Sequence, residues 1–390
     1  MKKILIFKGP NIDFENEIEK ERSGKEINTL ADLVEVIDAK NVNVNGMSKT
    51  DDTDENQKKE RYIKPLVVIH GSDFASVNPH VILNFVNNIL KRFVIDDLYI
   101  QNPPYRIEQA IEENYSKKII IKKRKEYYQP STNEVLKLYM DLSKSSKVVG
   151  QNKAKQSTCA GLFEQAYRKR SKPLVLLYYG PSGIGKTELA KEISKFYKGK
   201  LTRLQFSMFQ TGEAYDYLFG ADNTKASFAK DLITRESNVV LIDEFDKVSP
   251  SLYNAFYQVF DEGKFEDTLY KVDLQNCVFI LTSNFSDSND ILTRLDAPIY
   301  SRIDEKIEFK PLTVEQKKKL ITEKFEKILS ELEIEDKQII GESHLKEQYL
   351  KNADAFNNLR MLNKVMEANI YRYLMDIKLK EMNQKDKHKS

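Results

Sequence analysis

The chain has few of the residues that would place it in several common classes of protein. Its only cysteines, Cys159 and Cys277, are too few for a disulfide framework, and Cys277 lies in an apolar run. We therefore expect two buried thiols in a reducing compartment. No apolar run approaches the roughly 20 residues of a membrane helix. Lys8 interrupts the apolar start of the chain too early for a signal peptide, so we expect a cytosolic protein.

An excess of charge of one sign is also missing. Lys and Arg number 62 and Asp and Glu 59, which leaves a net charge of only +3. This balance gives little support to nucleic-acid binding. The content of 41% hydrophobic and 31% charged residues is that of an ordinary globular chain, and 390 residues suit two or three domains.

Residues 1–130 have the pattern of a small N-terminal α/β domain. A polar segment at 41–60 predicts a loop between its first two strands, and turn residues at 127–134 mark its end. Apolar runs that read as strands alternate with stretches of helical period. The strand runs are KKILIFKG, KPLVVIHG, DLYIQNPP and KKIIIKK, and the helical stretches are HVILNFVNNILKRF and RIEQAIEENY.

Residues 131–311 predict a second, larger α/β unit. Its strand runs are PLVLLYY, LTRLQFSM, SNVVLID and NCVFILT, with helical stretches between them. Such an alternation predicts a parallel sheet with helices on both faces. The pattern is wholly helical at 312–382, which predicts a C-terminal helical subdomain. Residues 383–390 form a charged tail that we expect to be disordered.

One glycine-rich stretch has the pattern of a phosphate-binding loop, G-x-x-x-x-G-K-[ST]. Glycines there let backbone N–H groups turn towards phosphate oxygens at the positive end of the next helix. Lys186 would reach the β and γ phosphates, and the Thr187 hydroxyl would hold Mg²⁺. The alternative is an empty glycine-rich turn, but a predicted strand before the stretch and a helix after it favour the phosphate loop. The stretch consists of Gly180, Pro181, Ser182, Gly183, Ile184, Gly185, Lys186 and Thr187.

A pair of carboxylates follows another buried strand run, VVLID. Asp243 would lie at the carboxyl end of that strand, where phosphates bind in a parallel sheet. It would bind Mg²⁺ through water, and Glu244 beside it could polarise the attacking water. The alternative is that the pair caps a helix, but the phosphate loop upstream favours the metal site.

Several segments resemble the Clp-type AAA+ ATPases, the family of unfoldases and disaggregases. VLIDEFDKVSPSLYNAFYQVFDEGKFED resembles the Walker B segment of that family. Upstream, VVGQNKA resembles the box that contacts adenine, with Val149 and Gly150 as the contact residues. Downstream, CVFILTSNF resembles the sensor 1 strand, with Asn284 as its polar tip.

Two arginines complete the resemblance, which covers roughly 145–375. IYSRIDEKIEFKPLT resembles the segment that carries the arginine finger, which makes Arg302 the finger. NNLRML stands where the family places sensor 2, which makes Arg360 its arginine, although Asn358 and Leu359 replace the usual Gly-Ala.

The resemblance implies a P-loop AAA+ module followed by a helical lid, with ATP and Mg²⁺ as cofactors. Asn284 would orient the attacking water with Glu244, and Arg360 would contact the phosphates from the same chain. Arg302 would serve the site of a neighbouring subunit, which implies a homo-oligomer, most simply a hexamer. Residues 1–130 lie outside the resemblance and would recognise a protein client or adaptor.

One segment, LFGADNTKASFAKDL at 218–232, departs from the family pattern. Members that thread polypeptides carry an aromatic G-Y-V-G-type loop here, which grips the substrate in the pore. This chain has a shorter segment with no Tyr after Gly220, and we expect Phe228 to pack on the core. Torsins are relatives that also lack the aromatic loop. We expect no processive threading, and no coupling to a ClpP-like peptidase because no docking loop follows sensor 1.

The sequence leaves three functions open. The first is an ATP-driven machine that remodels a protein partner. The second is a nucleic-acid-linked AAA+ ATPase, such as a loader or a component of a mobile element or of phage defence. Its support is the basic run KKIIIKKRKEYY at 117–128, which could equally be a solvated edge strand. The third is a switch that uses ATP only to assemble.

Overall fold

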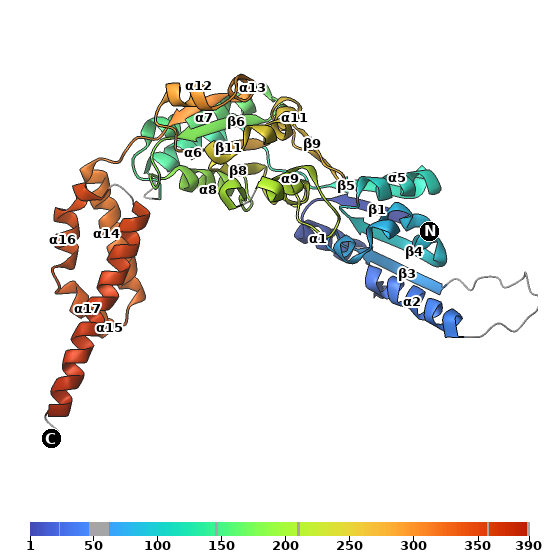
Figure 1. Ribbon diagram of the computed structural model, residues 1–390, viewed down its shortest axis with the longest axis horizontal. Helices are drawn as coiled ribbons and strands as arrows, with labels where there is room; N and C mark the ends of the chain where they lie inside the picture. Colours follow the sequence, from blue (N-terminus) through green and yellow to red (C-terminus); the bar gives the residue numbers. More distant parts are fainter. Residues whose placement is uncertain (23, 47–61, 145–146, 209–210, 357–358, 388–390) are drawn as a thin grey trace, which may run out of the picture.

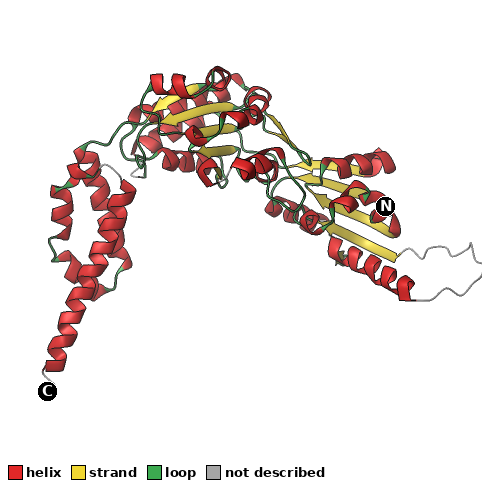
Figure 2. Cartoon of the chain, in the orientation of Figure 1, coloured by secondary structure: helices red, strands yellow, loops and turns green. Residues whose placement is uncertain are grey.

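The computed structural model describes residues 1–22, 24–46, 62–144, 147–208, 211–356 and 359–387. Three parts follow one another along the molecule: an N-terminal sheet with its helices, a larger central sheet with its helices, and a C-terminal helical bundle (Figure 1). The first two parts contain all the strands in the described ranges, and the third is built of helices alone (Figure 2). None of the described helices is long and apolar enough to cross a membrane.

The N-terminal part is built on a five-stranded sheet whose paired strands are all parallel. Helix α1 covers one face of the sheet with Phe14 and Ile18, and α5 packs Ile107 and Ile111 against the other face. In spatial order the strands are β2 (Ile27–Asn28), β3 (Tyr62–Ile69), β4 (Phe93–Gln101), β1 (Lys3–Lys8) and β5 (Ile120–Arg124). The helices are α1 (Asn11–Glu21), α2 (Leu30–Gly46), α3 (Pro79–Leu83), α4 (Phe85–Asn88) and α5 (Tyr105–Asn114).

Two local predictions for this part differ from the structure. The stretch HVILNFVNNILKRF is broken into α3, α4 and a short 3₁₀ turn rather than one helix. The break lies at Asn84, whose backbone (φ −120°, ψ 29°) leaves the helical region. The prediction of a loop at 41–60 is also partly wrong, because residues 41–46 continue helix α2. The rest of that loop up to residue 61 lies outside the described residues.

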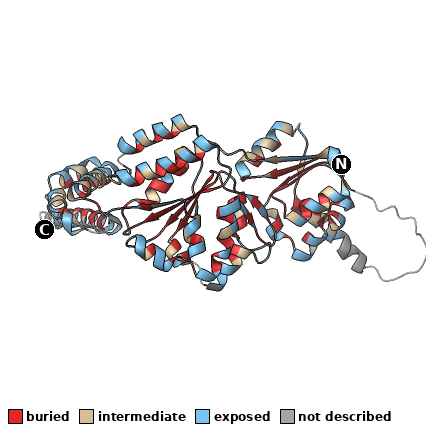
Figure 3. Cartoon of the chain, turned by 90° about the horizontal axis from the view of Figure 1, so that it is seen from above, coloured by how far each residue is buried: buried red, intermediate tan, exposed pale blue. Residues whose placement is uncertain are grey.

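The central part is a second parallel sheet with helices on both faces, as the sequence predicts. Its strands alternate between two cores: Val278 and Ile280 of β11 face the core under α7 and α8, and Phe279 and Leu281 face the core under α10 and α11. Figure 3 shows this arrangement as buried strands between helices whose outer faces are exposed.

In spatial order the strands of this sheet are β12 (Glu305–Glu308), β6 (Leu174–Tyr179), β11 (Val278–Thr282), β8 (Val239–Asp243) and β7 (Thr202–Gln205). A hairpin of β9 (Lys264–Glu266) and β10 (Lys271–Asp273) projects from it. The helices are α6 (Thr132–Lys144), α7 (Asn152–Arg168), α8 (Lys186–Phe196), α9 (Thr211–Phe219), α10 (Phe228–Ile233), α11 (Asn254–Glu262), α12 (Ser288–Arg294) and α13 (Ala297–Arg302).

The C-terminal bundle begins where Thr313 and Gln316 form a capping box at the start of α14. Its core includes Ile321 and Phe325 of α14 and Met366 of α17. The prediction of a disordered tail from residue 383 is wrong for residues 383–387, which continue helix α17. This stretch has no Gly or Pro that would end the helix. The helices are α14 (Val314–Glu331), α15 (Ile334–Gly341), α16 (Leu345–Lys351) and α17 (Leu359–Lys387).

Short 3₁₀ turns complete the chain: η1 (Asp73–Ser76), η2 (Leu90–Arg92), η3 (Lys117–Ile119), η4 (Phe206–Met208), η5 (Phe245–Lys247), η6 (Pro250–Leu252) and η7 (Ala353–Ala355). Both cysteines are buried and free, as predicted. Burial raises the pKa of the Cys159 thiol to about 12, so this thiol is a poor nucleophile at neutral pH. The overall fold therefore matches the predicted class, a parallel α/β module with helices on both faces, followed by a helical C-terminal subdomain and preceded by a small α/β part.

Candidate functional site

The predicted phosphate loop connects β6 to α8 at the carboxyl edge of the central sheet. Gly180, Gly183 and Gly185 have φ values of +126°, +79° and +105°, in the left-handed region that favours glycine. A Cβ atom at Gly180 would lie 2.2 Å from the carbonyl oxygen of Phe309, so no other residue fits there. The loop leads into the first turn of α8, and the N–H groups at the start of a helix attract anions because the helix itself offers them no acceptor.

Lys186 is held inside this loop. Its side chain is buried, with the residue only 8% exposed. The Nζ atom donates to the carbonyl oxygens of Gly180 (2.6 Å) and Pro181 (2.8 Å), and to Oδ1 of Asn284 (3.4 Å). The structure thus brings together two predicted site residues, Lys186 and Asn284, from the ends of neighbouring strands.

The carboxylate pair lies at the end of β8, next to β11. Asp243 is 6% exposed, and its Oδ2 accepts from Arg203 Nε (3.1 Å) and Nη2 (2.5 Å). Its Oδ1 accepts from the hydroxyl of Thr282. The same hydroxyl oxygen accepts from the backbone N–H of Glu244 at 3.1 Å, so Thr282 fixes both carboxylate residues.

Glu244 has an unusual backbone conformation for a residue that is not glycine. Its φ and ψ are 57° and 45°, in the left-handed region. Such a conformation costs on the order of 1–3 kcal/mol and persists only where the surroundings impose it. Here Phe245, which follows it, is buried between the rings of Tyr253 and Phe256 (centroids 5.7 and 5.6 Å) and holds the turn in place.

Sequence reasoning missed Thr282 and Arg203. Thr282 is the last residue of the apolar run NCVFILT. A polar residue at the end of a buried strand, two positions before Asn284, is a signal that could have identified it. Arg203 lies on β7, beside β8, and the pairing of these strands places Gln205 opposite Asp243. Nothing in the sequence around Arg203 indicates that its side chain reaches across to Asp243.

The predicted adenine box lies against both the phosphate loop and the start of the helical bundle. Val149 is buried, and Gly150 has φ +68° with the Gln316 side chain where a Cβ atom would lie (2.6 Å). The Gln151 side chain donates to the carbonyl oxygens of Ile184 (3.3 Å) and Lys310 (2.7 Å). A base held here would contact the phosphate loop and the C-terminal subdomain at once.

The two predicted arginines are placed differently. Arg302 ends α13, and its guanidinium pairs with Asp261 Oδ2 (2.8 Å from Nε, 2.6 Å from Nη2) and lies 4.8 Å from the centre of the Tyr257 ring. These partners belong to α11, so the structure does not bring Arg302 to Lys186. Arg360 is in the first turn of α17, but its side chain is outside the described part, as is Asn358.

The residues present fit a nucleotide with Mg²⁺. In the described ranges no cluster of three or more His, Cys, Asp or Glu side chains could hold a metal by itself. Mg²⁺ in nucleotide sites needs no such cluster, because it takes one or two protein oxygens and completes its shell with phosphates and water. The Thr187 hydroxyl and the Asp243 carboxylate are oxygen ligands of this kind.

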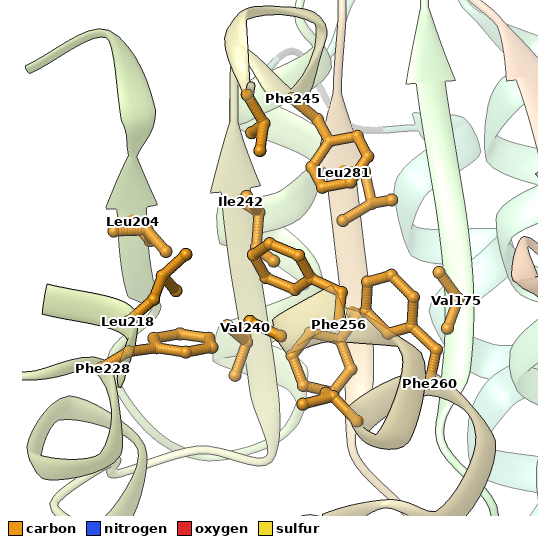
Figure 4. Packing of buried hydrophobic residues seen from close by; sticks show 14 of the residues in the cluster. Val175, Leu204, Leu218, Phe228, Val240, Ile242, Phe245, Phe256, Phe260 and Leu281 are labelled. Carbon is orange, nitrogen blue, oxygen red and sulfur yellow. The ribbon is translucent and has the colours of Figure 1, made fainter. Parts of the chain in front are cut away.

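The segment at 218–232 packs as predicted. Phe228 is fully buried as the first residue of α10, with its ring 5.0 Å from that of Phe265 and 6.2 Å from that of Phe256 (Figure 4). Gly220 has φ +78°, and a Cβ atom there would lie 2.6 Å from Thr268 Oγ1. The only aromatic ring after Gly220 in this segment therefore belongs to the core.

Comparison with known proteins points to one family. The family model described as the AAA domain of the Cdc48 subfamily matches residues 172–335. The chaperone protein ClpB of Clostridium tetani is 27% identical over 256 residues, 57% of this chain and 30% of that protein. ClpB of Malacoplasma penetrans is 24% identical over 285 residues, 67% of this chain and 40% of that protein. The mitochondrial disaggregase of Bos taurus is 34% identical over 150 residues, 35% of this chain and 22% of that protein.

A solved structure shares the fold over most of the chain. The closed-state cryo-EM reconstruction of Hsp104 with ATPγS and FITC casein matches with a TM-score of 0.53 and 16% identity, over 97% of this chain and 89% of that chain. This chain spans 40% or less of the length of the curated relatives named above. The family match and the relatives agree with the order of the motifs: residues 172–335 form an AAA domain, and it is similar to those of the Clp-type chaperones named above.

Proposed function

We propose that this protein hydrolyses ATP and uses the reaction to remodel a protein partner. The observation that carries the proposal is the convergence of charged and polar groups on one edge of the central sheet. Lys186 contacts Asn284, and Thr282 joins Asp243 to Glu244. Phosphoryl transfer depends on positioning and on neutralisation of charge, and these are the groups it requires.

Each side chain has one task in this scheme. ATP supplies the phosphoryl group and Mg²⁺ neutralises part of its charge when both are bound. Lys186 exchanges the carbonyl oxygens of Gly180 and Pro181 for phosphate oxygens. Asp243 would release Arg203 and hold Mg²⁺ through water, while Thr282 keeps the carboxylate in place. Asn284 orients a water molecule, and Glu244 accepts its proton.

Arg302 would act on the site of a neighbouring subunit. Its guanidinium is held on α11 by Asp261 and Tyr257, and it does not contact Lys186 of its own chain. A trans-acting arginine completes a site only across an interface, so we propose a closed homo-oligomer, most simply a hexamer.

The partner would be a protein recognised through residues 1–130. The curated relatives are named chaperones and a disaggregase, and the Hsp104 reconstruction contains casein, which supports a protein client for this chain as well. With no exposed aromatic ring in the segment after Gly220, we propose local remodelling without threading, in the cytosol and without a ClpP-like peptidase.

The nucleic-acid alternative depended on the basic run at 117–128. In the structure four of the six basic side chains of this run pair with carboxylates, and three of them are Lys122 with Glu108 (2.8 Å), Lys123 with Glu17 (2.5 Å) and Lys125 with Asp13 (2.6 Å). Arg124 pairs with Asp273 at 2.7 Å. These carboxylates neutralise much of the positive charge of the run, which weakens its support for nucleic-acid binding and favours the protein-remodelling function.

Glu244→Gln is the variant that tests the proposal. It removes the proton acceptor and keeps the shape of the side chain, so we expect ATP to bind and hydrolysis to stop. The matched control is Glu262→Gln at the exposed end of α11, which should hydrolyse ATP at the wild-type rate. Wild-type hydrolysis by Glu244→Gln would refute the assigned base.

The same variant identifies the partner and separates the three functions. ATPase assays with unfolded protein, with DNA and with neither should show stimulation by protein only. Proteins that copurify with Glu244→Gln in the presence of ATP, and not with Lys186→Ala, are the expected clients. A switch that uses ATP only to assemble would form its oligomer without any turnover in the wild type.

A further inference from the structure

The loop between α9 and α10 contacts the N-terminal part of the same chain. Asn223 stands in a polar loop between exposed residues, yet it is only 2% exposed. Its side-chain Nδ2 donates to the carbonyl oxygens of Phe74 and Val77, each at 2.6 Å. Both acceptors belong to the turn η1 and the residue after it, at the carboxyl edge of the N-terminal sheet. One amide group therefore uses both of its N–H bonds to join two parts of the molecule.

Further contacts surround this one. The backbone N–H of Tyr105, at the start of α5, donates to the carbonyl oxygen of Leu269 at 2.8 Å. Leu269 lies in the turn between β9 and β10, and Arg124 pairs with Asp273 at the end of that hairpin. Two elements of the ATPase module, the loop after Gly220 and the β9–β10 hairpin, thus hold the N-terminal part where Figure 1 shows the two parts meeting.

The loop is braced from the side of the ATPase module. Lys230 of α10 donates from Nζ to the carbonyl oxygens of Asn223 and Lys225, each at 2.7 Å. Ser227, which caps α10, donates to Asp267 in the hairpin at 2.8 Å. Because these bonds fix the backbone of the loop, the amide of Asn223 is presented to η1 without a further cost in loop entropy.

The braced loop is also continuous with the nucleotide edge. Phe228 of α10 packs in the same core as Val240 and Ile242 of β8, the strand that ends at Asp243 (Figure 4). The docking contact and the carboxylate pair are therefore connected through one helix and one strand of a close-packed core.

We propose that the segment 221–225 is a docking element for the chain's own N-terminal part, and that Asn223 is the residue that holds it. The N-terminal part occupies the segment, so a client polypeptide reaches this segment only after the two parts separate. This proposal goes beyond the proposed function, because it concerns how the chain is held together whether or not ATP is hydrolysed.

Asn223→Asp tests the proposal with almost no change in size. A carboxylate has no N–H to donate and would face two carbonyl oxygens, so the two parts should separate. The control is Asn254→Asp, the same change at an exposed position at the start of α11. Spin labels at the exposed positions Lys117→Cys and Lys264→Cys report the separation in the full chain, because Cys159 and Cys277 are buried.

We expect one narrow distance distribution in the wild type and in the control, and a longer, broader one in Asn223→Asp. Hydrogen exchange of the backbone amides at 73–77 should accelerate by about tenfold or more in Asn223→Asp alone. Unchanged distances and exchange in a folded Asn223→Asp would overturn the proposal. No nucleotide is needed, so an error in the ATPase assignment would leave this result unaffected.

A second variant covers the case in which Asn223→Asp does not fold. Asn223→Ala combined with Tyr105→Pro removes the donors on both sides of the contact and adds no charge. Proline is tolerated at Tyr105, the first residue of α5, because Pro104 before it is already extended (φ −47°, ψ 141°). Separation of the labels in this double variant, and not in Tyr105→Ala, supports the proposal, and unchanged distances refute it.

Discussion

The two parallel sheets of this chain have the same number of strands and use their carboxyl edges in opposite ways. At the edge of the N-terminal sheet the polar groups bind one another. Asn102 accepts from the N–H of Gly9 (2.9 Å) and donates to its carbonyl oxygen (2.8 Å), while Gln101 donates to the same oxygen (3.0 Å). The N–H of Gly71 donates to Gln101 at 3.2 Å, so the edge is closed by its own hydrogen bonds.

At the edge of the central sheet the polar groups are charged and their partners can be exchanged. Lys186 contacts backbone carbonyl oxygens and an amide, and Asp243 pairs with Arg203, which is partly exposed. A phosphate or a metal ion can replace such partners without breaking the sheet. A parallel sheet therefore provides the location for a site, and the central sheet places charged residues with exchangeable partners at that location.

The largest expected effect distinguishes the two edges directly. Lys186→Ala should abolish nucleotide binding, because the phosphates lose their main cationic contact, and should leave thermal stability almost unchanged. Calorimetric titration with ATP and a thermal melt measure both quantities. Lys191→Ala, in the second turn of α8 and exposed, is the control and should bind ATP normally. ATP binding by Lys186→Ala at the wild-type affinity would contradict the assignment of a nucleotide site to this edge of the central sheet.

The next effect tests whether the site of the central sheet needs a second subunit. Arg302→Ala should lower turnover by on the order of 10³-fold and leave ATP affinity intact. Light scattering should show a ring-sized assembly of the wild type with ATP. A monomer with full activity would contradict the trans-acting role.

Mixing two inactive variants sharpens this test. Lys186→Ala subunits would donate a sound Arg302 to Arg302→Ala subunits, whose phosphate loops are sound. Part of the ATPase activity should return in the mixture. If mixed oligomers form and no activity returns, Arg302 acts within its own chain or has no role in turnover.

The central sheet also shows which features of the fold and of the site could be predicted from the sequence. Gly180 to Thr187 could be assigned because spacing along the chain determines a phosphate loop. The burial of Phe228 also followed from local pattern, since it stands on the inner face of a short helix. These properties depend on residues that are close in the sequence.

Contacts between distant segments could not be predicted in this way. Arg203 reaches Asp243 across 40 positions of sequence, and Asn223 reaches Phe74 across 149. Each contact depends on the pairing of strands or on the meeting of two parts, for which one sequence carries no signal. Thr282 is intermediate, because its position before Asn284 is visible but its bond to Asp243 requires the register of β8 and β11.

A smaller effect is expected at the edge of the N-terminal sheet. Asn102 is 3% exposed with φ 44°, so Asn102→Ala removes its hydrogen bonds and adds a strained alanine. We expect the N-terminal part to lose about 1–3 kcal/mol of stability, since the buried N–H of Gly9 loses its acceptor and the carbonyl oxygen of Gly9 keeps only the bond from Gln101. Denaturant unfolding followed by hydrogen exchange measures this, and ATP affinity should not change. Asn102→Gly, which relieves the strain, should lose less. Weakened ATP binding would contradict the separation of the two edges.

The smallest effect concerns pH and the charges beside the N-terminal edge. Glu108 of α5 pairs with Lys8 and Lys122, each at 2.8 Å, on the strands β1 and β5. Burial opposes its ionisation, but hydrogen bonds from Lys122 and Lys8 outweigh burial and hold the pKa of Glu108 below its ordinary value. A carboxyl whose pKa is lowered by folding stabilises the fold above its unfolded pKa, about 4.3, and loses that contribution as the pH falls below it. The N-terminal part should therefore lose stability on acidification through this range. Glu108→Gln should weaken this dependence of stability on pH. The control Glu113→Gln, at an exposed position of the same helix, should leave the dependence unchanged. Equal pH dependence in Glu108→Gln and the wild type would show that these ion pairs do not stabilise the edge.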